Sequence, residues 1–163
     1  MSMPQVPAVE AFLPDWSVRR FLVVDKSGRW PPAIAAQVME QLRDRTGGDQ
    51  DGGSIVFDSF TTTKDLAPVA QQINTAALVI FLDGLERECL TLLRRFVLAP
   101  RRPAILIVAD EHHQELMPVL LESGVDSLLF DVVNDIPIAE WCLRLLPNRS
   151  YSGNAVRTDA PAQ

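Results

Sequence analysis

Short apolar runs alternate with longer amphipathic segments along most of the chain. Each run has the length of a strand, and the run ALVIFL at 77–82 is apolar throughout, which is typical of a strand buried on both faces of a parallel sheet. Acidic, glycine or proline residues separate the runs from the segments that follow. The pattern predicts five strands, at residues 21–25, 54–58, 77–83, 104–109 and 127–130.

The segments between these runs carry apolar residues at the spacing of a helix face. Ile34, Val38 and Leu42 follow one another at intervals of four, so they lie on one side of a helix. The segment 111–123 also has a helical pattern, but Pro118 within it predicts a kink or a late start. Similar apolar stripes predict further helices. One carries Leu66, Val69, Ala70 and Ile73 and is capped by Thr62 or Thr63. The others carry the stripes that begin at Leu85 and at Ile138, and the last closes near Pro147.

Five strands that alternate with five helices predict an α/β fold in which helices cover both faces of a parallel sheet. Because crossover connections are right-handed, the expected architecture is a three-layer, doubly wound, flavodoxin-like sheet of order 2-1-3-4-5. The folded domain is expected to span residues 18–147. A loose lead-in at 1–17 and a disordered polar tail at 148–163 are predicted to flank it.

Composition removes several classes of function. The 163 residues carry 15 Lys and Arg against 21 Asp and Glu, a net charge of −6, so nucleic acid and anionic lipid are not expected partners. No apolar run approaches the roughly 20 residues of a membrane helix, and the first ten residues lack a secretory pattern. Cys89 and Cys142 lie on helical apolar stripes, which favours buried thiols in a reducing cytoplasm.

Candidate chemistry gathers where the predicted strands end, because the carboxyl ends of parallel strands form the functional edge of such sheets. Asp25 and Asp83 end strands that should be adjacent, so their carboxylates are expected to be neighbours and to suit Mg²⁺ or Ca²⁺. The other strand ends are also acidic, with Asp58, Asp110, Glu111 and Asp131. For Asp58, Asp110 and Asp131 we expect the usual role of acids in turns and helix caps that face water.

Two further groups of polar residues have simpler interpretations. His112 and His113 are adjacent, so they cannot share a helix face, and we expect solvated side chains rather than a two-histidine metal site. Arginines surround the end of the third predicted helix, where a helix C-terminus favours cations; a docking patch for an acidic partner is the alternative. They are Arg94, Arg95, Arg101 and Arg102.

Three segments resemble the receiver domain of two-component response regulators. FLVVD at 21–25 is similar to the first receiver strand and its acid, and VIFLD at 79–83 is similar to the third strand. LLESGVDSLL at 120–129 is similar to the turn before the last strand. The resemblance implies that Asp83 has the phosphoacceptor position and that Asp25, Asp83 and the carbonyl of Leu85 would hold Mg²⁺.

The chain departs from the receiver pattern at Val132, which replaces a proline, in the loop 84–87, and at three positions that bear directly on phosphate binding. Lys26 stands where the family carries a second acid, Val108 stands in place of the hydroxyl residue, and Asp131 replaces the phosphoryl-binding lysine. A phosphoryl group adds about −1.5 to −2 charge and needs donors. The methyl groups of Val108 and the carboxylate of Asp131 supply no hydrogen-bond donor to such a group.

The sequence therefore predicts a degenerate, pseudo-receiver domain that is not an enzyme, needs no cofactor and signals by protein–protein contact. The expected face lies around the fourth helix, fifth strand and fifth helix, with Met117, Leu121 and Trp141, and it would meet a signalling partner or a second copy. The alternative is an atypical but working receiver, phosphorylated on Asp83 with Mg²⁺. A third interpretation, a flavodoxin-like binder of a small ligand, is disfavoured by the acidic, glycine-poor edge.

Overall fold

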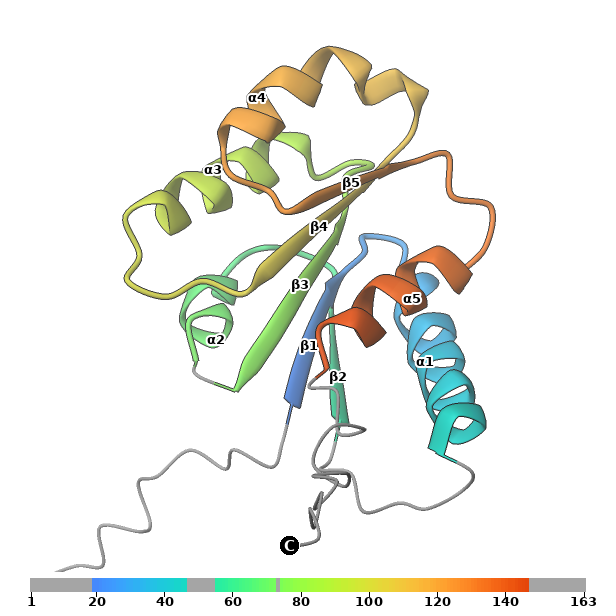
Figure 1. Cartoon of the computed structure of the whole chain (residues 1–163). Coiled ribbons are helices and arrows are strands. Elements are labelled where there is room, and N and C mark those ends of the chain that lie inside the picture. Colours follow the sequence, from blue (N-terminus) through green and yellow to red (C-terminus); the bar gives the residue numbers. More distant parts are fainter. Residues whose placement is uncertain (1–18, 47–54, 73, 147–163) are drawn as a thin grey trace, which may run out of the picture.

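A five-stranded parallel sheet lies between two layers of helices (Figure 1). The computed structural model describes residues 19–46, 55–72 and 74–146. In chain order the elements are β1 (Arg19–Val24), α1 (Trp30–Thr46), β2 (Ile55–Phe60), α2 (Leu66–Ala70), β3 (Thr75–Phe81), α3 (Glu86–Val97), β4 (Ala104–Ala109), the 3₁₀ helix η2 (Glu111–Leu116), α4 (Met117–Glu122), β5 (Ser127–Phe130) and α5 (Ile136–Arg144).

The strand order is β2-β1-β3-β4-β5, and every neighbouring pair is parallel. This confirms the predicted doubly wound sheet of order 2-1-3-4-5. The central strand β3 pairs with β1 on one side and β4 on the other, which explains its unbroken apolar sequence. The predicted strands at 104–109 and 127–130 have the bounds of β4 and β5.

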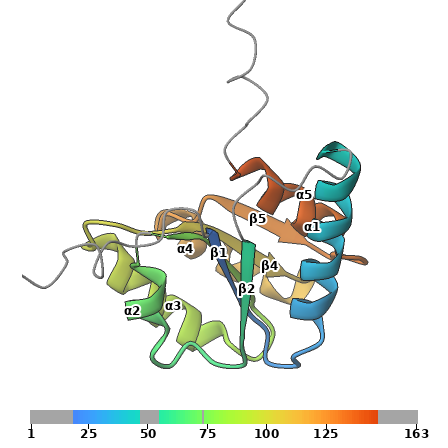
Figure 2. The ribbon, with the colours of Figure 1, turned by 90° about the horizontal axis from the view of Figure 1, so that it is seen from below.

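Alternate residues of each strand enter two separate cores. Leu22, Leu78 and Ile80 face the layer of α2, α3 and α4, while Phe21 and Val79 face α1 and α5. Figure 2 shows α1 and α5 on one side of the sheet, with α2 and α3 on the other. This alternation follows from the two-residue period of a strand, because successive side chains point to opposite faces of the sheet.

Three predicted strand ends differ from the structure: β1 ends at Val24 and β3 at Phe81, before Asp25 and Asp83, and β2 runs past Asp58. The strand β2 does not end at Asp58 but continues to Phe60, so Asp58 lies inside it, opposite Leu22. The carboxylate of Asp58 is 3.0 Å from Nε of Arg20 on β1. An edge strand has one partly solvated face, which accepts an acid that a central strand would exclude. Asp58 therefore plays no part at the carboxyl edge.

The predicted late helix start at Pro118 is confirmed. The 3₁₀ helix η2 ends at Leu116, and α4 begins at Met117 with Pro118 in its first turn. A proline has no N–H to donate, and the first turn of a helix needs none. The predicted cap at Thr62 or Thr63 is wrong, because α2 covers only Leu66–Ala70 and its N-cap residue is Asp65. Ile73, the last residue of the predicted apolar stripe, lies outside the described residues.

No helix in the described part of the chain is both long enough and apolar enough to cross a membrane. The lead-in predicted at 1–17 and the tail predicted at 148–163 fall outside the described residues.

Candidate functional site

Asp25 follows β1 and is only 5% exposed. Its Oδ1 accepts hydrogen bonds from the backbone N–H and the hydroxyl of Ser27, at 3.0 and 2.9 Å. Its Oδ2 accepts from the Ser27 hydroxyl at 2.8 Å and from the backbone N–H of Trp30, the first residue of α1, at 2.9 Å. The carboxylate therefore organises the β1–α1 loop and satisfies a free donor at the start of α1.

Lys26 extends from the same loop toward the residue after Asp83. A Cβ built on Gly84 would lie 2.9 Å from Cδ and 3.2 Å from Nζ of Lys26, so the lysine occupies the space that a side chain at 84 would need. Gly84 also has a φ of +73°, a conformation that suits glycine. No ion pair within 4.0 Å joins Lys26 to an acid among the described residues.

The residues that would hold Mg²⁺ in a receiver do not fit that ion here. Both oxygens of Asp25 already accept hydrogen bonds from their own loop, and the carbonyl of Leu85 accepts the N–H of Cys89 at 2.8 Å in the first turn of α3. Mg²⁺ prefers one or two free carboxylates and several waters. Lys26 stands at the sequence position where a receiver carries a second acid, so one of the expected oxygen ligands is missing.

An open hollow of about 410 Å³ lies at the carboxyl ends of β3 and β4. Its floor is apolar: the rings of Trp30 and Phe81 stack with centroids 5.1 Å apart, and Val108 lies beside them. The lining residues include no lysine, arginine, serine or threonine. They are Trp30, Phe81, Leu82, Asp83, Val108, Ala109, Asp110, His113, Asp131, Val132 and Val133.

Asp131 ends β5 at the position of the receiver lysine. Its backbone has a φ of +51°, an unusual conformation that aspartate tolerates better than most residues. Its Oδ1 accepts the backbone N–H of Glu111 at 3.2 Å, so it links the start of η2 to the end of β5. The side chain thus supplies a negative acceptor to the rim of the hollow.

His113 is buried, which corrects the prediction of a solvated side chain. Its Nε2 lies 3.0 Å from Oε1 of Glu86 at the start of α3, and its Nδ1 lies 2.9 Å from Oδ1 of Asp110. The N–H of Asp110 also donates to Nδ1, at 3.2 Å. The 3₁₀ helix turns His113 inward, whereas His112 beside it stays exposed.

Glu86 completes this arrangement. The pKa of its carboxyl is held below the usual range, first by a hydrogen bond from its own backbone N–H and then by the bond with His113, while partial burial acts in the opposite direction. The N–H of Gly84 adds a further hydrogen bond at 3.2 Å. Asp83, Glu86 and His113 each place one potential ligand atom within 4.8 Å of the others.

Neither the role of Glu86 nor the inward position of His113 was predicted from the sequence. The available signal was a capping box, in which the side chain at the third helical position reaches back to the N-cap residue. Asp110 and His113 have that spacing, with histidine in the place usually taken by glutamate. Glu86, three residues after Asp83, has no local signal, because its partner is 27 positions away.

The predicted contact face has mixed exposure. Leu121 is 55% exposed, and Val119, Val133 and Ile136 are also exposed. Trp141 is half-buried, with its indole N–H donating to the hydroxyl of Ser127 at 3.1 Å. Met117 is half-buried. Figure 1 shows α4 and the β5–α5 connection flanking the outer strand β5.

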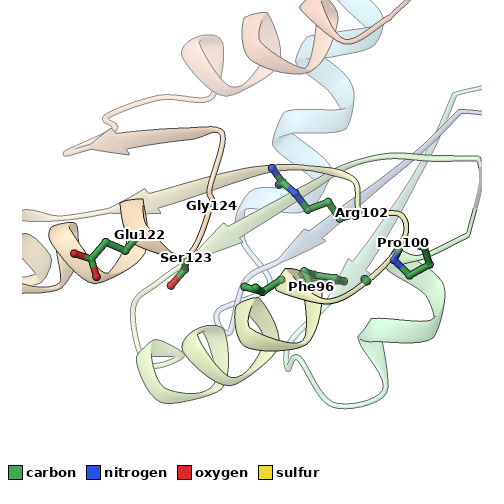
Figure 3. Close-up of a pocket in the computed structure, with 8 residues that line it drawn as sticks. Phe96, Pro100, Arg102, Glu122, Ser123 and Gly124 are labelled. Atoms are coloured by element: carbon green, nitrogen blue, oxygen red, sulfur yellow. The ribbon is translucent and has the colours of Figure 1, made fainter.

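A second hollow lies at the opposite, amino-terminal end of the strands. Figure 3 shows Phe96 of α3 on one side and Glu122 and Ser123, from the end of α4, on the other. Arg102 at this end pairs with Asp126 at 3.0 Å, and Asp126 also accepts the N–H of Ile105 at 2.7 Å. One arginine of the predicted basic patch is therefore engaged in joining β4 to the turn before β5.

Both cysteines are buried and free. Burial raises the pKa of the Cys89 thiol and of the Cys142 thiol to about 12 in each case. The thiolate is the reactive form, so neither side chain is suited to be a nucleophile or a metal ligand in the folded chain.

No protein-family model matches the chain. No curated protein matches it in sequence either.

Solved structures do match the fold. A response regulator receiver protein from Burkholderia phymatum shares 15% identity and a TM-score of 0.54, over 78% of this chain and 94% of its own. A chemotaxis response regulator of Vibrio cholerae shares 12% identity and a TM-score of 0.53, over 79% and 99%. The chain has the fold of a response regulator receiver domain.

A third match has a different described role. A streptococcal protein, described as one of a family of redox sensors that evolved from two-component response regulators, shares 10% identity and a TM-score of 0.60. The match covers 78% of this chain and 50% of the streptococcal one. At these identities the matches establish the receiver fold, and the chemistry of this receiver must be argued from its own residues.

Proposed function

We propose that this chain is a receiver-fold signalling module that acts by protein–protein contact and is not phosphorylated on Asp83. The observation that carries the proposal is the composition of the hollow beside Asp83. A phosphoryl group placed there would meet the carboxylates of Asp110 and Asp131 and an apolar floor. A charge-assisted hydrogen bond contributes about 1.5–3 kcal/mol, and a like charge opposes binding instead.

This chain also lacks the residue at the end of β4 through which a phosphorylated receiver passes on its signal. Such a switch needs a group at the end of β4 that responds to the phosphoryl oxygens. Val108 has no hydroxyl and is 6% exposed within the core against α1 and α5. The polar contacts at this end of β4 instead belong to Asp110 and His113, which tie the end of β4 to α3.

A redox function, as described for the streptococcal protein, finds no support in the thiols. Both are buried with their pKa raised to about 12, so they are protonated at neutral pH. Such thiols are consistent with a reducing compartment, and we place the function in the cytoplasm.

The phosphorylation part of the proposal has a direct test. Incubation of the full chain with acetyl phosphate and Mg²⁺ should give no mass gain of one phosphoryl group, because no lysine or arginine lines the hollow and two carboxylates beside Asp83 do. A receiver known to accept phosphate is the positive control under the same conditions. A Mg²⁺-dependent mass gain that disappears in Asp83→Asn would overturn this part and restore the alternative of a working receiver.

The partner for the α4–β5–α5 face is a protein segment with an apolar centre and a basic rim. The exposed apolar side chains Val119, Leu121 and Ile136 supply the centre on this chain. Acidic residues surround them, and Arg144 is the one lysine or arginine between positions 117 and 144. A second copy would set acids against acids, so charge complementarity favours a different, basic protein.

Site-specific photocrosslinking tests this contact. A photoreactive amino acid at position 121, in cells that express the full chain, should give one discrete adduct that is lost when Ile136→Arg is added. Position 98 is the matched control, since Leu98 is 90% exposed but lies at the far end of α3. An adduct with a second copy, or equal adducts from positions 98 and 121, would contradict the proposed partner.

A further inference from the structure

The imidazole ring of His113 lies between two carboxylates. Nε2 is 3.0 Å from Glu86 and Nδ1 is 2.9 Å from Asp110, while only 7% of the side chain is exposed. A neutral imidazole has one N–H, so it can donate to one of these oxygens and must turn a lone pair toward the other. The pocket around the ring therefore favours an additional positive charge.

The backbone N–H of Asp110 indicates which ring nitrogen of His113 carries the proton. It donates to Nδ1, which favours a proton on Nε2 in the ion-free chain. That tautomer sets the Nδ1 lone pair 2.9 Å from an oxygen of Asp110. A metal ion on Nε2 would move the ring proton to Nδ1, from which it can donate to the Asp110 carboxylate, and the N–H of Asp110 would then give up Nδ1 as its acceptor. A carboxylate on the second ring nitrogen is the usual support of a metal-binding histidine.

Three ligand atoms converge at Nε2. Asp83 comes from the end of β3, Glu86 from the first turn of α3 and His113 from η2, and their ligand atoms lie within 4.8 Å of one another. Bonds of about 2.0–2.2 Å to one ion place neighbouring ligand atoms roughly 3 Å apart. The separation of Nε2 and Glu86 Oε1 is 3.0 Å, so these two atoms fit one ion without movement.

We propose that Asp83, Glu86 and His113 form a binding site for a divalent transition metal ion of the Zn²⁺ class, with Asp110 holding the imidazole. One nitrogen and two carboxylates favour such an ion over Mg²⁺ or Ca²⁺, which prefer oxygen ligands. Asp83 is exposed, so water can complete the coordination. The ion would tie the β3–α3 loop to the β4–η2 connection, and it would use the carboxylate that a receiver phosphorylates.

Metal titration of the full chain tests the site. After dialysis against EDTA, the protein should bind one Zn²⁺ by calorimetry, with a higher melting temperature and no comparable response to Mg²⁺. Co²⁺ should give visible absorption bands of a bound, low-symmetry ion. Absence of stoichiometric Zn²⁺ binding, or a preference for Mg²⁺, would overturn the proposal and leave His113 as a structural ion-pair partner.

Substitutions locate the ion. His113→Gln and Glu86→Gln should each abolish the Co²⁺ bands, and Asp110→Asn should weaken Zn²⁺ binding by about 10–100-fold. His112→Gln is the matched control, because His112 is the adjacent histidine and its side chain is 81% exposed. Glu86 is 41% exposed, so its variant should remain folded even where His113→Gln does not. Unchanged binding by Glu86→Gln would place the ion elsewhere and refute the site. Phosphorylation assays on protein dialysed free of Zn²⁺ and then supplied with Mg²⁺ alone, and crosslinking with the Glu86→Gln variant, keep the proposed function separate.

Discussion

Asp25→Ala should destabilise the folded chain by about 2–4 kcal/mol, a large effect for a residue at the position of a receiver's active-site acid. The variant removes the acceptor for the N–H groups of Ser27 and Trp30 and leaves these donors in a part-buried loop. A lost cap costs about 0.5–2 kcal/mol, and each buried group left unpaired adds about 1–3 kcal/mol. Urea denaturation monitored by circular dichroism measures the change.

Asp83→Ala is the matched comparison. Asp83 follows the neighbouring strand but is exposed, and its side chain forms no hydrogen bond with another of the described residues, so its removal should change stability by less than about 0.5 kcal/mol in EDTA. If Asp25→Ala were as stable as the wild type while Asp83→Ala were not, the structural assignment of Asp25 as a cap would be incorrect.

Leu78→Ala should cost about 2–5 kcal/mol, the other large expected effect. Leu78 lies on the central strand β3, is fully buried, and packs in the core shared with α2, α3 and α4. Its truncation removes apolar contacts and leaves a cavity that neighbouring strands cannot close. Because domains of this size are stable by only about 5–15 kcal/mol, the urea midpoint should fall sharply.

Leu98→Ala makes the same chemical change on the surface. Leu98 ends α3 and is 90% exposed, so its variant should stay within about 0.5 kcal/mol of the wild type. Ile80→Val, at another fully buried position of β3, should cost about 0.5–1.5 kcal/mol and covers the case in which Leu78→Ala does not fold. Equal costs at positions 78 and 98 would contradict the two-core arrangement.

The acids expected at the carboxyl edge of the sheet do not form one cluster in the folded chain. From the sequence, all strand-end acids belong to one repulsive cluster, which accounts for the expected weakness of phosphate binding. In the folded chain they have separate partners: Asp25 binds its own loop, Asp58 lies near Arg20, and Asp131 accepts from Glu111. Asp83 itself lies in a smaller group of side chains, together with Glu86 and His113. The site is therefore organised by local hydrogen bonds, and its net charge alone does not describe it.

Much of the fold could be predicted because its signals are local. The apolar runs at 77–82 and 104–109 are too long and too continuous for solvent-facing strands, and right-handed crossovers then leave few sheet orders. Pro118 marked the late start of α4 for an equally local reason. The error at Asp58 arose because an acid was taken as a strand end, although an edge strand has a solvated face.

By itself, the sequence determined the receiver fold and the departures from the receiver pattern at Lys26, Val108 and Asp131, on which the proposed lack of phosphorylation rests. These properties depend on residue identity and short-range periodicity. Tertiary structure alone decided that Asp25 turns back to its own loop, and that Asp83, Glu86 and His113 meet. Side-chain direction and contacts between distant segments depend on how strands and helices pack, and no short stretch of sequence contains that information.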